Sequence, residues 1–154
     1  MTLNPSYATM ELTEGRTVNE KLQERLDKYT NQLKQLRLEQ IYRWTANDEL
    51  FDKKTDEQLL DFVIQKFETQ EPSYEYQEGA KFIRVVQKES NQNHGSAHAF
   101  VEKETGKLVK TASWSSPAKK KNGELQSKYN LLDDNSFELL IEQADIYGGH
   151  LYVR

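Results

Sequence analysis

An apolar stripe at helical spacing constrains this chain more than any other feature of its sequence. Its members are four, three, four and three positions apart, which places them on one face of an α-helix. They are Leu22, Leu26, Tyr29, Leu33 and Leu36. The other faces of this helix are polar, and such a helix needs a partner to cover its apolar side chains. We therefore expect this stripe to be a protein-interaction surface, contacting another protein or a second copy of the chain.

The boundaries of the helical region follow from capping residues and a proline. Thr17 with Glu20, and Thr55 with Gln58, have the spacing of capping boxes at helix N-termini. Pro72 disfavours continuation of the second helix. The sequence thus predicts an extended or flexible N-terminus over residues 1–16, a helical region over 17–70 and a linker over 71–79. Whether residues 17–43 form one helix or two stays open, and a short helical turn is expected around Leu50 and Phe51.

Charge and composition change at the end of this linker. Residues 1–78 carry 10 Lys and Arg against 16 Asp and Glu, a net charge of −6. Residues 79–154 carry 11 against 9, a net charge of +2, and contain six of the seven glycines. We therefore place the main domain boundary here, with a second domain over residues 80–154.

This second domain has the pattern of a small sheet followed by a helix. Residues 81–87 are rich in apolar and β-branched side chains, as in a covered strand. Residues 97–103 and 108–114 flank a turn in which Gly106 can take a positive φ, so they predict a hairpin. A helix beginning near Asn135 and a last strand over 150–154 follow. An isolated hairpin is marginally stable, so these strands are expected to share one antiparallel sheet.

The predicted fold class is therefore α+β. It consists of a helical N-terminal region followed by a small antiparallel sheet, with one C-terminal helix packed on that sheet.

One segment of this domain resembles a known family. The HAFV run beginning at His98, the Thr105-Gly106 turn, the strand ending at Trp114 and the Pro117–Lys119 exit resemble a strand–turn–strand signature of small proteins encoded by tailed bacteriophages. Residues 144–152 resemble the end of the same module, so the likeness covers about half of the chain. That family has no assigned activity. The resemblance implies a phage origin and no catalytic residue.

Composition and motifs argue against several classes of function. The 154 residues include no cysteine, which excludes disulfides, thiolate metal sites and a cysteine nucleophile. No apolar run approaches the ~20 residues of a membrane span, and no secretory signal precedes the first helix. Nucleotide-binding glycine motifs, HExxH and GxSxG are also absent from the sequence. We assign no catalytic residue, cofactor or metal, and expect a protein that works inside a cell without a membrane partner.

The three histidines leave one enzymatic alternative. His98 and His150 are expected on neighbouring strands, whereas His94 precedes the first of them in a loop. Ordinary hydrogen-bonded histidines are the favoured interpretation. A small enzyme centred on His98, with a serine or carboxylate neighbour, is the alternative.

A lysine-rich segment offers a second alternative. Residues 103–121 contain six lysines and one glutamate, a local net charge of +5, and Trp114 lies among them. Lysines that neutralise phosphates beside an aromatic ring are typical of single-stranded nucleic-acid binding. The candidate residues are Lys107, Lys110, Trp114, Lys119, Lys120 and Lys121. A solvated loop explains the same lysines, and the sequence pI of about 5.5 does not favour a dedicated nucleic-acid protein.

The sequence thus favours a non-enzymatic bacteriophage protein, virion-associated or accessory, that acts through protein–protein interaction. Its expected partners are other phage proteins or itself, and its expected location is the infected host cytoplasm or the virion.

Overall fold

The computed structural model describes residues 18–47, 56–89 and 95–152. Its longest element is α2 (Val18–Ala46), a single unbroken helix of 29 residues. The described part of residues 17–43 therefore forms one helix and not two. Several predictions lie outside the described residues: the extended start over 1–16, the caps at Thr17 and Thr55, the turn around Leu50 and Phe51, and the position of His94.

The predicted antiparallel sheet is present and has six strands. They are β1 (Ser73–Glu78), β2 (Phe82–Lys88), β3 (Ser96–Glu102), β4 (Lys107–Ser113), β5 (Ser116–Pro117) and β6 (Ser127–Asn130). The order is β1-β2-β3-β4-β5, and β6 pairs with β4 beside β5. Gly106 has φ 83° in the β3–β4 turn, which confirms the predicted hairpin. Helix α4 (Asp134–Gln143) follows, capped by the Asp133 side chain. The fold class is α+β.

Two predicted segments have a different structure. Residues 71–79 are not a linker, because β1 pairs with β2 from Ser73 to Glu78 and forms the edge of the sheet. Residues 150–154 were predicted as a strand, which is wrong for the described part. Gly148 takes φ 78°, and Gly149–Leu151 form a short 3₁₀ helix, η2. Tight glycine turns of this kind break the extended geometry that a strand needs.

The apolar stripe of α2 lies in the core and not on an external surface. Leu22, Leu26, Tyr29 and Leu33 are each at most 1% exposed, and they share one cluster with the sheet and α4. The predicted interaction surface is therefore wrong for these four residues, while Leu36 packs against the same cluster and is partly buried. The physical reason is that the facing strands present their own apolar side chains, Ile83, Val85, Ala99, Val101 and Leu108.

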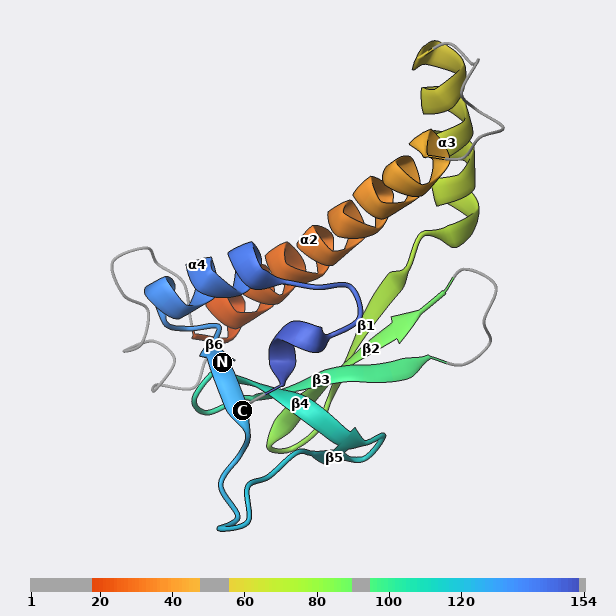
Figure 1. Cartoon of the computed structure of the whole chain (residues 1–154). Coiled ribbons are helices and arrows are strands. Elements are labelled where there is room, and N and C mark those ends of the chain that lie inside the picture. Colours follow the sequence, from red (N-terminus) through yellow and green to blue (C-terminus); the bar gives the residue numbers. More distant parts are fainter. Residues whose placement is uncertain (1–17, 48–55, 90–94, 153–154) are drawn as a thin grey trace, which may run out of the picture.

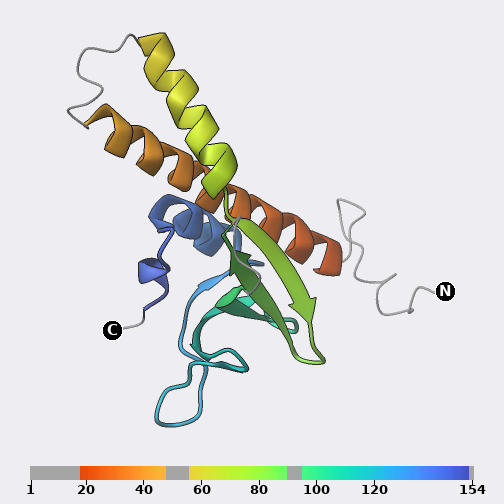
Figure 2. The same cartoon turned by 90° about the vertical axis from the view of Figure 1, so that its right-hand side faces the viewer.

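The core joins the two predicted domains into one unit. Helix α2 crosses one face of the sheet, and α4 lies beside its N-terminal half (Figures 1 and 2). Polar contacts fix the same arrangement. Arg25 donates to the Leu131 carbonyl (2.9 Å), forms an ion pair with Asp134 and stacks 4.8 Å from the Phe137 ring centre.

The far end of α2 continues beyond the sheet. There it is joined by α3 (Asp56–Gln70), and the two helices project from the body as a hairpin (Figure 1). Val63 is the buried residue of α3. Lys34 pairs with Glu71 (3.8 Å) where α3 ends, before buried Pro72 leads into β1. Within this hairpin, α3 is therefore held in place mainly by its packing on α2.

Truncating the core stripe should cost much more stability than truncating the hairpin. Leu26→Ala should lower the free energy of unfolding by about 2–5 kcal/mol, because it removes a fully buried leucine. Leu60→Ala, at a leucine that is 52% exposed, should change it by about 0.5 kcal/mol or less. Urea unfolding followed by circular dichroism measures both. Equal effects would contradict the assignment of the stripe to the core.

Candidate functional site

The middle of the core contains three polar side chains, which we call the Tyr–His cluster: Tyr29, His98 and His150. The Tyr29 hydroxyl lies 2.6 Å from His98 Nε2 and 2.8 Å from His150 Nε2. Tyr29 comes from α2, His98 from β3 and His150 from η2. Three elements that are distant in sequence therefore meet at one hydroxyl group.

A β-bulge directs His98 into this cluster. Val85 pairs with Ala99 but Val86 pairs with Ala97, so His98 is one extra residue on β3. Simple strand alternation would place His98 and Ala99 on opposite faces of the sheet. A bulge re-aims a side chain, and here both His98 and Ala99 reach the face that α2 covers. The predicted proximity of His98 and His150 is confirmed, although a 3₁₀ helix and not a strand supplies His150.

The hydrogen-bond partners determine which atom donates and which accepts in each hydrogen bond of the cluster. The Asp145 amide donates to His150 Nδ1 (3.0 Å), so a neutral His150 carries its proton on Nε2 and donates it to the Tyr29 oxygen. The Tyr29 hydroxyl then donates to His98 Nε2, so a neutral His98 carries its proton on Nδ1. Each group therefore donates to the next, from the Asp145 amide through His150 and Tyr29 to His98. The last donor of this series is His98 Nδ1–H.

Burial keeps all three groups neutral. Removal from water, together with the neighbouring His150, lowers the pKa of His98 to about 4. Burial also lowers the pKa of His150 to about 4, against an opposing effect of Asp145. Burial raises the pKa of the Tyr29 hydroxyl. No serine or carboxylate side chain hydrogen-bonds to His98 among the described residues, so the enzymatic alternative gains no nucleophile or orienting acid there.

A second feature is an apolar groove on the projecting hairpin, which we call the distal groove. It has a volume of about 520 Å³ between α2 and α3. Its apolar lining residues are Leu38, Tyr42, Leu60, Val63 and Ile64. Tyr42, Leu60 and Ile64 are 46%, 52% and 44% exposed, so the groove is open to solvent. They are three of the five exposed large apolar side chains on the described part of α2 and α3.

An acidic row lies on α3 next to the groove-lining Leu60 and Ile64, at three or four positions from one of them, although its members do not line the groove themselves. Glu57, Asp61 and Glu68 are exposed and recur at intervals of four and seven along α3, which puts them on one side of the helix. Helix α3 carries four acidic residues and one basic residue, Lys66, whose ammonium lies 5.7 Å from the Phe62 ring centre. Gln35, Glu39 and Arg43 of α2 also line the groove. Its apolar floor therefore has one acidic and one basic lining side chain, and the acidic row adds negative charge on the α3 side.

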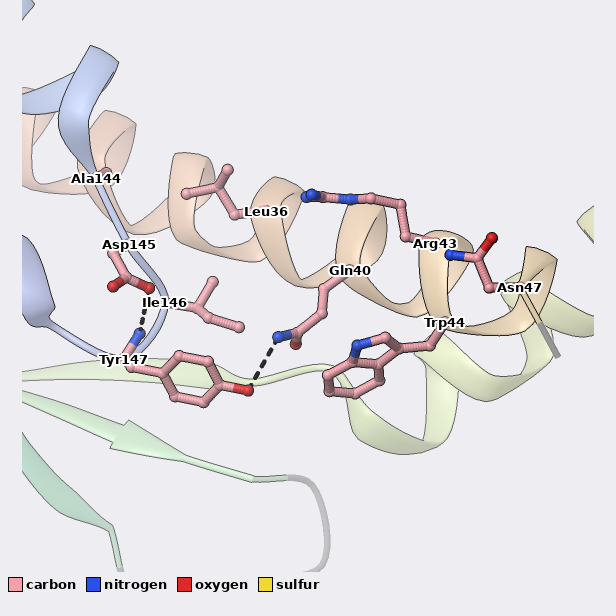
Figure 3. A pocket seen from close by; sticks show the side chains of 9 residues that line it. All are labelled: Leu36, Gln40, Arg43, Trp44, Asn47, Ala144, Asp145, Ile146 and Tyr147. Carbon is pink, nitrogen blue, oxygen red and sulfur yellow. Dashed lines mark hydrogen bonds between the residues drawn. The ribbon is translucent and has the colours of Figure 1, made fainter.

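A separate cleft of about 440 Å³ lies on the body side of α2 (Figure 3). Gln40 donates to the Tyr147 hydroxyl across it (2.9 Å), and the Tyr147 amide donates to Asp145 (3.1 Å). Trp44 and Tyr147 stay 55% and 70% exposed at its edge. The protein's own side chains bridge this cleft, and Trp44 extends the exposed apolar surface at the far end of α2.

The candidate nucleic-acid-binding side chains of the lysine-rich segment lie at separate positions on the protein. Lys107 begins β4 and Trp114 follows its end, about 20 Å away at strand spacing. The Lys110 ammonium lies 4.4 Å from the Tyr152 ring centre, and the Arg84 guanidinium covers one face of Trp114 at 4.3 Å. Lys119, Lys120 and Lys121 are exposed in the β5–β6 loop. The structure does not gather these candidates into one compact patch.

Sequence reasoning missed the distal groove, although two signals pointed to it. The stripe of α2 shifts after Leu36 to Leu38 and Ile41, which opens a second apolar side. In α3, Leu60 and Ile64 share one helical face with Val63, and the exposed Phe62 lies on another face. Apolar residues on several faces of one helix indicate more than one contact.

The chain matches a family of unknown function, DUF7717, over residues 10–153. It belongs to this family. The matched residues include the helical segment as well as the sheet, in agreement with their shared core. No curated protein and no solved structure matches the chain.

Two properties of the described residues bear on cofactors and membranes. Within residues 18–47, 56–89 and 95–152, His, Cys, Asp and Glu side chains form no group of three or more that could hold a metal ion. No helix in these same ranges is long and apolar enough to cross a membrane.

The Tyr–His cluster predicts a specific pH dependence of stability. His98 and His150 have a pKa near 6.5 in the unfolded chain, whereas their pKa in the folded protein is about 4. The free energy of unfolding should therefore fall as the pH drops through this window, by up to about 1.4 kcal/mol per pH unit for each histidine. Urea titrations at pH 7, 6, 5 and 4.5 measure the slope. A flat profile would contradict neutral, buried imidazoles.

Proposed function

We propose that this DUF7717 protein is a non-enzymatic protein that acts by binding another protein through the distal groove. The observation that carries the proposal is the exposure of Tyr42, Leu60 and Ile64, about half each, around one apolar groove. Contiguous exposed apolar surface on a soluble domain is typical of an interaction site. The rigid body, in which α2 is held by the sheet and α4, presents this groove at a distance.

The chemistry of the groove supports a basic amphipathic helix as the partner segment. A groove between two helices accepts the apolar face of a third helix, with anchors at intervals of three and four residues. The acidic row of Glu57, Asp61 and Glu68 favours lysine or arginine on the flanks of that helix. The same row disfavours a second copy of α3, which would bring like charges together.

The cellular setting is a second part of this proposal. The resemblance of residues 98–119 to proteins of tailed bacteriophages supports a role as a virion-associated or accessory phage protein. Its location would then be the infected host cytoplasm or the particle. Mass spectrometry of purified virions should detect it at a defined copy number if it is a structural component. Its presence only in the lysate of infected cells supports the accessory role, and its absence from both contradicts a phage role.

A designed peptide tests the groove without knowledge of the natural partner. The probe is a fluorescein-labelled 18-residue helix with leucines on one face and lysines on the other, studied by fluorescence anisotropy. We expect saturable binding that weakens as salt is raised, because the flanking contacts are electrostatic. The double substitution Leu60→Ala with Ile64→Ala should weaken binding at least tenfold.

Matched controls make this result specific. Leu139→Ala removes an exposed leucine of α4 and should leave binding unchanged. A peptide with glutamate in place of lysine should bind at least tenfold more weakly, and Glu57→Gln with Asp61→Asn should reduce that difference. Equal binding of both peptides would contradict the role of the acidic row, and unchanged binding after the Leu60 and Ile64 substitutions would contradict the groove itself. Binding of oligo-dT in preference to the peptide would favour the nucleic-acid alternative.

A further inference from the structure

A hollow outside the distal groove lies at the open end of the Tyr–His cluster. It has a volume of about 310 Å³ and is bounded by the start of β3, the middle of β4 and residues 146–152. The lining residues that matter here are His98, Lys110, Thr111, Gly148 and Tyr152. Nothing in the protein-binding proposal uses this hollow.

His98 turns its remaining nitrogen toward this hollow. A Cβ atom added at Gly148 would lie 3.8 Å from His98 Cε1 and 3.9 Å from Nδ1, so this edge of the ring faces Gly148 at the lining. The donor chain of the cluster puts the proton on Nδ1. Within the described residues, no hydrogen bond from this N–H is present. The Nδ1–H group thus faces the hollow, and the hydrogen bond of Tyr29 to the other ring nitrogen fixes its position.

Lys110 supplies a positive charge at the same hollow. Its ammonium lies 4.4 Å from the Tyr152 ring centre and makes a long contact of 3.5 Å to the Thr111 carbonyl oxygen. None of the residues that line the hollow is an aspartate or a glutamate. The ammonium therefore keeps donor capacity for a ligand, and no lining carboxylate neutralises it.

We propose that this hollow binds a small oxyanion group, a carboxylate or a phosphate, through His98 Nδ1–H and the Lys110 ammonium. A ligand at this position must accept the histidine proton and complement the lysine charge, which favours an anion and disfavours a cation. Gly148 keeps the wall open for it, because a side chain at φ 78° would be strained and would stand close to His98. The neutral state of His98 at pH 7 supports its role as a donor on one nitrogen.

The test is nuclear magnetic resonance of the imidazole groups in the full chain at pH 7. Inorganic phosphate and acetate are titrated separately, with sodium chloride at equal ionic strength as the reference. We expect a saturable shift of the His98 Nδ1 and Cε1 signals that exceeds the shift of His150. Lys110→Met should weaken the response at least tenfold. Lys107→Met removes an exposed lysine of the same strand outside the hollow and should leave the response unchanged.

Each outcome bears on the proposal. Saturation with both anions, or with one of them, supports the site and identifies the oxyanion it prefers. A response that does not saturate, that chloride reproduces, or that Lys107→Met and Lys110→Met weaken equally overturns it. Circular dichroism spectra of the two variants establish that both are folded, so a lost response is not a lost fold. Failure of this test leaves the distal groove untouched, because the two sites share no residue.

Discussion

Packing of the α2 stripe on the sheet is the contact on which the rest of the structure depends. The sheet has short strands, and the helix is polar on its remaining faces, so neither would bury enough apolar surface alone. Leu22, Leu26 and Leu33 are fully covered in one cluster that includes Val85, Ala99 and Val101 of the sheet and side chains of α4. This contact also fixes which part of α2 lies over the sheet and which part extends beyond it. The helix thereby has two roles: a buried half that holds the fold and a projecting half that carries the distal groove.

The same contact explains how a polar cluster can occupy the middle of the core. Tyr29 interrupts the leucines of the stripe, and its hydroxyl would be costly to bury without partners. The two histidines satisfy it, and the Asp145 amide satisfies the far nitrogen of His150. Only the His98 Nδ1–H is left for the hollow among the described contacts of the cluster. The arrangement favours a positioned donor over a proton-transfer catalyst, because burial moves both imidazole pKa values to about 4, well below neutrality.

The two proposed sites differ in the charged residues that surround them, so they favour different ligands. An acidic row lies on α3 next to the distal groove, whereas the hollow beside His98 contains a lysine and no carboxylate. Arg25, which binds Leu131 and Asp134, anchors the other end of α2 far from the hairpin. A partner helix in the groove and an oxyanion in the hollow would therefore bind to one rigid body at different places.

The sequence by itself determined the elements that depend on local periodicity: the helix through Leu22 to Leu36, the strand over 81–87, the hairpin around Gly106 and the helix after Asn135. These follow from side-chain spacing and turn chemistry, which neighbouring residues control. Only the tertiary structure decided which apolar face is covered, because Leu26 and Leu60 look alike in sequence and differ only in what lies opposite them. It also showed residues 73–78 to be an edge strand and not a linker, because backbone pairing with β2 orders a segment whose side chains are mostly polar. The bulge that turns His98 toward Tyr29 has the same origin, because register between strands is invisible to a local pattern.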